Sequence, residues 1–462
     1  MNNKNIICIV LVIGIVLAWY SGINNAVSES GNYKNYVRLA EDYAEEELYE
    51  KAINEYKSAL TFKEAMDIRL RIIELYRAGF ETGEITTDGN LVAMILETMS
   101  IYRDKSEAYE AACDYFYSVM DYDELTNAIR LSEKNNISSK KIDEIRGKVR
   151  YLYERAFSTF SEPVNLTNGY YLIKDKDSEY SLNLEYDVHA QEKLFVAPYS
   201  TDGMTVVKAL DNKVYIVSND GTRQKYLDEN IILSSGMADG RIACKTGETW
   251  AYYNYQGEKV SEDYVYAGRF LYGVAAVQKE AGKWQLINTE FQPLTDAVYE
   301  DVKLNSAEEC ASSLVVLAKA NGKYNLLTID GYSADAPEKV SLEAVDGFSC
   351  VDCDLPIDPT VNMNKGEVWF AFKDEATQKW GYADCSGKIM IEPKFAEAKS
   401  FSNGYAAVKD NEVWNYADTL GNVVIETKAT NVGYFNPNGY CMLQFDNGYW
   451  TYIRMYFWEM AS

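Results

Sequence analysis

The chain has 462 residues, 47% of them hydrophobic and 25% charged, so it is long enough for two or three folding units with buried cores and does not have the composition of a disordered chain. Its 70 acidic and 45 basic residues give a net charge of -25, which repels phosphate backbones and makes nucleic acid an unexpected partner. Eight cysteines are scattered along the chain apart from one close pair, a density that does not indicate a disulfide framework.

The N-terminal segment is uncharged and strongly apolar, with the run "IICIVLVIGIVLAWY" over residues 6–20. As a helix this run measures about 22 Å, and extension to Ile23 brings it close to a hydrocarbon core of roughly 30 Å. Lys4 precedes the run and acidic residues follow it, so the positive-inside rule places the bulk of the chain outside. We expect residues 1–30 to be a single-pass membrane anchor or signal-anchor; a cleaved signal peptide is the alternative and would leave the chain secreted.

Residues 31–160 are expected to form an all-α domain, because apolar residues recur at steps of three and four and the stretch 32–160 contains no proline. The stretch "YVRLAEDYAEEELYEKAINEYKSAL" resembles a tetratricopeptide repeat, in which small residues let paired helices approach closely. Later segments keep the helical period and match that repeat poorly, and we read them as helices that stack on the first pair. The last helix is expected over roughly 139–160. In the first unit, the small residues are Ala40, Ala52 and Ala59, with Tyr43 and Tyr56 between the helices.

Residues 165–462 change to alternating apolar and polar residues in short runs, separated by glycine turns, which is the pattern of β-strands. The nonapeptide "KWGYADCSG" over Lys379–Gly387 recurs in this region with an anchor residue and, seven places later, a glycine. The anchor and glycine pairs are Val214 and Gly221, Trp250 and Gly257, Tyr324 and Gly331, Trp380 and Gly387, and Trp414 and Gly421; Trp284 has Phe291 in place of glycine, and Trp450 begins a partial copy.

The fullest unit, "KWGYADCSGKIMIEPKFAEAKSFSNGYAAVKDNEVW", resembles the bacterial WG-repeat family, and the resemblance covers most of residues 170–458. Only the unit at Trp380 keeps the literal Trp-Gly. The resemblance implies a β-repeat architecture in a surface protein, and no reaction.

Three tight turns in about 35 residues predict that each repeat forms a unit of four strands. The expected fold class for the whole chain is multidomain, with a transmembrane helix, an all-α tetratricopeptide-like domain and an all-β domain. We expect seven or eight units in a propeller-like closed array; an open stack of β-sheets is the alternative. The repeated tryptophans are expected to pack between units, and the repeated glycines to occupy turns with positive φ.

No catalytic, cofactor-binding or metal-ligating residue is predicted, and no cofactor. The chain has one histidine, His189, so a zinc site with several histidine ligands is excluded. A Ser-His-Asp triad would need His189, which lies in a divergent copy of the repeat. Cys350 and Cys353 have redox spacing, but they lie in an irregular insertion, 334–366, so an ordinary or disulfide-linked pair is the favoured interpretation. That insertion is the part of the β region best suited to carry binding specificity.

These features predict a non-catalytic, membrane-anchored extracytoplasmic scaffold that binds protein or peptide partners through its helical and β-repeat surfaces. A cell-wall or carbohydrate-binding module is one alternative, motivated by the many tyrosines and tryptophans. The second alternative is a hydrolase that uses a pair of carboxylates. Acidic residues are so abundant that spacing in the sequence does not identify which two would form the pair.

Overall fold

The computed structural model describes residues 30–458 except 162, 168–169, 176–177, 184–187, 191–203, 209–212, 219–223, 228–229, 356–368 and 411. The chain divides into two compact units, Met1–Arg150 and Tyr151–Ser462, which we call the helical unit and the β unit. The predicted transmembrane helix is not part of the described fold, since no helix among the described residues is long and apolar enough to cross a membrane. Residues 1–29, on which that prediction rests, lie outside the described residues.

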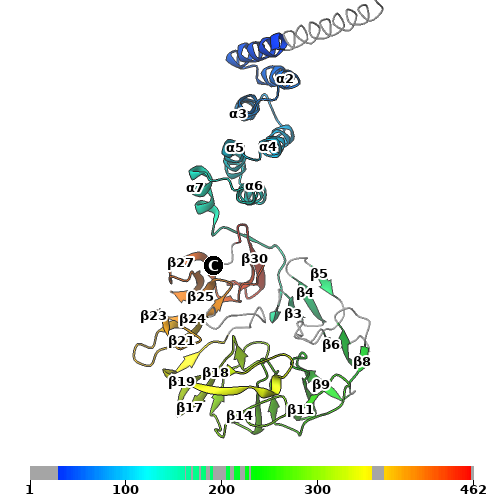
Figure 1. The fold of residues 1–462 in the computed structure, drawn as a ribbon, viewed down its shortest axis with the longest axis vertical. Helices are drawn as coiled ribbons and strands as arrows, with labels where there is room; N and C mark the ends of the chain where they lie inside the picture. The colour runs from blue at the N-terminus through cyan, green and yellow to red at the C-terminus, as the bar shows by residue number, and fades with distance from the viewer. Residues whose placement is uncertain are drawn as a thin grey trace, which may run out of the picture. The chain divides into compact units, whose positions relative to one another are not determined.

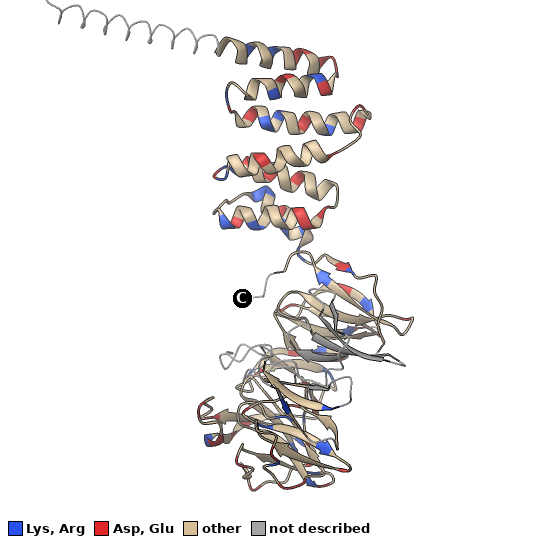
Figure 2. Ribbon diagram, turned by 90° about the vertical axis from the view of Figure 1, so that its right-hand side faces the viewer, with Lys and Arg blue, Asp and Glu red and all other residues tan. Residues whose placement is uncertain are grey.

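Seven described helices follow one another in the helical unit, and each packs on its neighbour in the chain (Figure 1). Ala40, Ala52 and Ala59, the small residues of the predicted helix pair, are completely buried, and the close approach of the two helices stays a prediction. Acidic and basic residues are interspersed along these helices (Figure 2). The helices cover 30–45, α2 Tyr49–Leu60, α3 Met66–Thr82, α4 Gly89–Ile101, α5 Ser106–Ser118, α6 Tyr122–Lys134 and α7 Lys140–Val149.

Several helices of this unit end on a residue with left-handed backbone. Gly83 (φ 78°) and Asn136 (φ 57°) are residue types that adopt this conformation readily. Glu47 (φ 59°) and Met120 (φ 59°) occupy the same position after their helices, although a β-carbon is disfavoured there. After Glu47, Met120 and Asn136 the backbone N–H of the following residue closes the turn, as in the 3.0 Å bond from Asp121 N to the carbonyl oxygen of Phe116. After Gly83 the closing bond, also 3.0 Å, runs from Ile85 N to the carbonyl oxygen of Gly79.

The last helix is shorter than predicted. Helix α7 ends at Val149, and the next residues form strand β1 (Tyr153–Arg155), which pairs with β30 (Trp450–Met455) at the other end of the β unit. The expectation of a helix to residue 160 was wrong because this pairing, made across about 300 residues, overrides the local helical pattern.

The described strands of the β unit form eight antiparallel sheets. The first five sheets, in chain order, contain β2 Pro163–Thr167, β3 Tyr170–Asp175, β4 Ser178–Asn183 and β5 Val188–Ala190; β6 Met204–Lys208, β7 Val214–Ser218 and β8 Gln224–Tyr226; β9 Ile231–Ser234, β10 Ile242–Thr246 and β11 Thr249–Tyr253; β12 Tyr266–Ala267, β13 Ala275–Glu280 and β14 Lys283–Ile287; and β15 Asp301–Val302, β16 Ala311–Ser312, β17 Val315–Ala320, β18 Lys323–Asp330 and β19 Ser341–Cys350. The last three contain β20 Asp352–Cys353, β21 Trp369–Lys373, β22 Trp380–Asp384 and β23 Ile389–Phe395; β24 Glu397–Ser402, β25 Tyr405–Asp410, β26 Val413–Ala417 and β27 Val423–Ala429; and β28 Asn431–Val432, β29 Tyr440–Gln444, β30 and β1.

The predicted closed, propeller-like array is wrong, and the predicted four-stranded unit is found in four of the eight described sheets. The described strands form open sheets of three, four or five strands, and no strand of one sheet pairs with a strand of another. The alternative, a set of open β-sheets, describes the fold. Turn signals in the sequence mark where the chain reverses, but they do not determine how many strands pair in each sheet or how one sheet is placed on the next.

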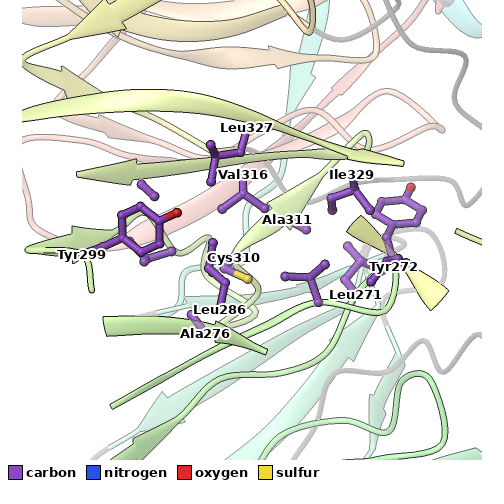
Figure 3. Close-up of a cluster of buried hydrophobic side chains, with 14 residues drawn as sticks. Leu271, Tyr272, Ala276, Leu286, Tyr299, Cys310, Ala311, Val316, Leu327 and Ile329 are labelled. Atoms are coloured by element: carbon purple, nitrogen blue, oxygen red, sulfur yellow. The ribbon is translucent and has the colours of Figure 1, made fainter. Parts of the chain in front are cut away.

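Successive sheets are joined by apolar side chains. In one cluster, Ala276 and Leu286 from the sheet β12–β14 face Val316 and Leu327 from the sheet β15–β19, with Cys310 between them (Figure 3). The seven anchor residues of the sequence repeat belong to seven different apolar clusters, which confirms the predicted packing role of the tryptophans. Six of these clusters join successive sheets, and the one at Trp450 joins Met442 of β29 to Ile173 of β3. The anchor residues are Val214, Trp250, Trp284, Tyr324, Trp380, Trp414 and Trp450.

The repeated glycines occupy a recurrent turn. In the unit at Trp380, the side-chain oxygen Oδ1 of Asp384 accepts hydrogen bonds from the backbone of Ser386 (2.9 Å) and Lys388 (3.1 Å), and Gly387 has φ 81°. The positive φ predicted for the glycines is confirmed at four of the five positions, Gly257, Gly331, Gly387 and Gly421, while Gly221 lies outside the described residues. Phe291 adopts φ 64° in the place of glycine, and its ring stacks on Tyr252 at 5.5 Å.

The glycine of the literal Trp-Gly pair has a different role. A β-carbon at Gly381 would lie 2.6 Å from the carbonyl oxygen of Ile391 and 2.8 Å from the nitrogen of Pro393, where the pairing of β22 with β23 is irregular. At this position a β-carbon therefore cannot be admitted unless the backbone at Ile391 and Pro393 moves.

We predict that Gly381→Ala lowers the free energy of unfolding of the β unit by about 1–3 kcal/mol, because backbone atoms must move to admit the methyl group. Urea unfolding followed by tryptophan fluorescence measures the change. Gly147→Ala in α7 is the control: it has open space around it and is expected to stabilise the helical unit by about 0.5–1 kcal/mol, seen by circular dichroism. An unchanged urea midpoint for Gly381→Ala would contradict the close approach.

Candidate binding surfaces

Arg269 connects three successive sheets of the β unit. It lies between β12 and β13, and its Nη1 forms an ion pair with Oε1 of Glu309, which lies between β15 and β16. Its Nη2 donates to the carbonyl oxygen of Met237, between β9 and β10, at 3.3 Å. The other carboxylate oxygen of Glu309 accepts from Asn305 Nδ2 at 2.9 Å. The side chains of the pair are 4% and 3% exposed, so both charges are held inside the protein by fixed partners.

We predict that breaking this pair is more harmful than replacing it. Arg269→Met or Glu309→Gln alone should lower the free energy of unfolding by about 3–5 kcal/mol, because a buried partner loses its counter-charge, whereas Arg269→Met with Glu309→Leu should cost less than the sum. Urea denaturation of the four proteins gives the coupling free energy. Asp263→Asn, which breaks the exposed pair with Lys259 (2.7 Å), is the control and should change stability by less than about 1 kcal/mol. Additive single effects would contradict the interpretation.

Asp354 makes the corresponding connection in the C-terminal part of the β unit. Its Oδ2 accepts from the hydroxyl of Tyr434 at 2.6 Å and from the backbone of Ser400 at 2.7 Å. The Ser400 hydroxyl donates to the Asp354 carbonyl oxygen at 2.6 Å and accepts from Ala371 N at 2.9 Å. Asp354 follows β20, Ser400 lies in β24 and Tyr434 follows β28, so three successive sheets meet at one carboxylate.

Lys399 lies beside this network, with its ammonium 5.7 Å from the ring of Trp414 and 5.8 Å from the ring of Tyr434. It donates to the Val432 carbonyl oxygen, and burial lowers its pKa. Serine, lysine and tyrosine together can form a nucleophilic site, but Ser400 is completely buried and its hydroxyl already makes two hydrogen bonds. The network therefore holds the sheets together.

Glu308 is an exposed residue whose carboxyl group is nevertheless partly shielded from water by neighbouring protein atoms. The residue is exposed and has φ 62°, while its side chain forms a hydrogen bond with Tyr266, whose ring contacts Trp250 and Trp284. Surrounding protein atoms raise the pKa of the Glu308 carboxyl by desolvation, and the bond from Tyr266 offsets part of this effect.

We predict that Glu308→Gln stabilises the protein at neutral pH and not in acid. A carboxyl whose pKa is raised by folding opposes folding once it ionises, so the penalty is present above its folded pKa and absent below its unfolded pKa of about 4.3. Urea midpoints of wild type and variant should differ at about pH 7 and converge at about pH 3.5. Glu290→Gln is the control for loss of one charge. An equal difference at both pH values would contradict this assignment.

Several charged groups of the helical unit pair with each other. Arg69, whose side chain is 9% exposed, bonds Glu64 at 2.7 Å and Glu97 at 3.1 Å, and so ties α3 to the loop before it and to α4. Asp114 of α5 is shared between Arg77 of α3 (3.0 Å) and Lys141 of α7 (3.4 Å). Apolar side chains are exposed as well, most of all Met120 at 71% and its neighbour Val119 at 49%.

The structure brings the two cysteines singled out in the sequence together in one cluster, and it places His189 in a different sheet. His189 lies in β5, opposite Leu182 of β4, and Cys350 and Cys353 are buried between sheets. The insertion 334–366 is more regular than predicted: it contains the 3₁₀ turn Pro337–Lys339 and the ten-residue strand β19, while 356–368 lie outside the described residues. Among the residues with described positions, no group of three or more His, Cys, Asp or Glu could hold a metal ion.

Sequence reasoning missed Arg269, Glu309 and Asp354. The two polar connections join residues 40 and 80 positions apart, from Arg269 to Glu309 and from Asp354 to Tyr434, and no spacing rule links them. The feature that Arg269 and Asp354 share is that each follows the end of the first strand of its sheet within two residues, β12 and β20 respectively.

Two stretches of the chain, 250–284 and 380–414, match the family of WG containing repeats. Each begins at a tryptophan anchor, so the predicted WG repeat is confirmed for these two units. No curated protein matches the sequence. Among solved structures, BamB from Moraxella catarrhalis is similar at 10% identity with a TM-score of 0.33, covering 66% of this chain and 98% of that one. A eukaryotic initiation factor is similar at 12% identity with a TM-score of 0.35, covering 60% and 78%.

Proposed function

We propose that this protein is a non-catalytic extracytoplasmic scaffold that binds protein or peptide partners on the surfaces of its helical and β repeats. The observation that carries the proposal is Met120, which is 71% exposed and has left-handed backbone in the turn between α5 and α6. A large apolar side chain in that conformation lowers the stability of the isolated protein in two ways: the backbone is strained, and apolar surface is exposed to water. A partner that covers the side chain accounts for its presence there.

The comparison with the other helix ends supports this reading. Gly83 and Asn136 suit the left-handed conformation, and Glu47 is polar, so Met120 alone among these four places an apolar side chain there. Val119 extends the apolar surface by one residue. Methionine is enriched and charged residues are depleted in the buried centres of protein interfaces, which fits an exposed methionine at a binding surface.

The architecture of both units is compatible with this role. Helical hairpins and small sheets that pack mainly on their neighbours in the chain build extended surfaces that bind other molecules. A location outside the cytoplasm, at the cell membrane or after secretion, belongs to the proposal and rests on the sequence of residues 6–20. Protein partners are favoured over glycans because the repeat tryptophans lie in the clusters between sheets.

We predict that Met120→Asn weakens partner binding and does not weaken folding. Asparagine tolerates left-handed backbone, so stability should stay equal or rise by up to about 1 kcal/mol, while the apolar contact is lost. Affinity capture with the full chain from cell-envelope extract, read by quantitative mass spectrometry, should show specific partners whose recovery falls with the variant.

Glu47→Asn is the matched control, because it makes the same backbone change at a position that is already polar. It should raise stability and leave partner recovery unchanged. Capture of no protein by the wild-type chain, together with pelleting on cell-wall material, would contradict the proposal and favour the carbohydrate-binding alternative. Equal losses for both variants would show that the turns, and not the apolar side chain, matter.

A further inference from the structure

Cys350 and Cys353 form a pair at a junction between two sheets. Cys350 ends β19, which pairs with β18 in one sheet, and Cys353 ends β20, which pairs with β21 in the next. The chain bends at Val351 between them. The bend brings the two side chains into contact, and the thiol of Cys353 forms a hydrogen bond with that of Cys350.

The two thiols lie in the same apolar cluster, and each residue is 1% exposed. Phe348 and Leu355 belong to this cluster, and so does one further cysteine, Cys385. The structure holds all three as free thiols. The backbone on both sides of the bend is fixed by strand pairing, Cys350 opposite Tyr324 and Cys353 opposite Phe372, so the approach of the two sulfurs is part of the fold.

We propose that Cys350 and Cys353 form an intramolecular disulfide that closes the crossing from the sheet β15–β19 to the sheet β20–β23. Each thiol gives up a proton, and the two sulfurs together give up two electrons as the S–S bond forms. An external disulfide accepts both electrons and both protons and is reduced to two thiols. The inference concerns the folding of the β unit and does not depend on the proposed binding function.

The burial of the pair decides when this exchange takes place. The attacking species is a thiolate, and burial raises the pKa of Cys353 far above its usual value; the bond from Cys350 raises it further. Lys303, which bonds Asp352 at 3.1 Å, acts in the opposite direction and does not compensate. Exchange is therefore slow in the folded reduced chain, and the bond forms while β19 and β20 are still accessible during folding.

The test is to refold the reduced full chain with oxidised glutathione or with reduced glutathione. The thiols are then alkylated under denaturing conditions, and the digested peptides are analysed by mass spectrometry. With oxidised glutathione, the peptide that contains Cys350 and Cys353 should be two hydrogens lighter and carry no alkyl group. Alkylation of both residues, or a bond from either one to Cys385, would overturn the proposal.

Two further measurements keep the test independent of any one variant. The oxidised chain should unfold at a higher urea concentration than the reduced chain. This shift should vanish in Cys350→Ser. It should persist in the control Cys244→Ser, because Cys244 is a buried cysteine in another cluster. The folded reduced chain treated with oxidised glutathione should gain the bond many times more slowly than the refolding chain. Equal rates would overturn the assignment of the step to folding, and a urea shift that persists in Cys350→Ser would overturn the pairing.

Discussion

The β unit depends on side-chain packing between successive sheets. A sheet of three to five short strands cannot bury its own faces, and in the described chain no strand pairing passes from one sheet to the next. Six of the interfaces between successive described sheets are instead each filled by an apolar cluster that includes one anchor residue of the sequence repeat, such as Trp250 or Trp414. This explains why the motif tolerates valine or tyrosine at the anchor: the position requires a large or branched apolar side chain, and not tryptophan in particular.

Two polar connections add directionality to this packing. The guanidinium of Arg269 and the carboxylate of Asp354 each bind groups from the two adjoining sheets, and such contacts are satisfied only at one relative placement. Apolar clusters alone permit small shifts between sheets, whereas these bonds do not. These hydrogen bonds also bear on function. Ser400, Lys399 and Tyr434 are residue types that can form a nucleophilic site, but here their polar groups are bonded to other parts of the β unit.

In the helical unit, one residue departs from the usual preference for glycine or asparagine at a left-handed helix end, and this departure suggests a binding role. Four of its described helices end on left-handed residues, where glycine and asparagine are the usual choices, and Met120 departs from that choice with an exposed apolar side chain. Phe291 departs from the corresponding rule in the β unit, but its ring packs on Tyr252, so the strain there is compensated within the fold. The difference between the two cases is whether the chain itself covers the side chain.

The sequence by itself determined the features that depend on neighbours in the chain: the helical and β regions, the recurring turn of Asp384 and Gly387, and the apolar role of the anchors. These follow from period and spacing, which act over a few residues. Only the tertiary structure decided that residues 153–155 leave the helical pattern to pair with β30, that the sheets are open, that Arg269 meets Glu309, and that the Cys350 and Cys353 thiols touch inside a cluster. The physical reason is that these contacts join segments brought together by packing, so their partners cannot be read from either segment alone.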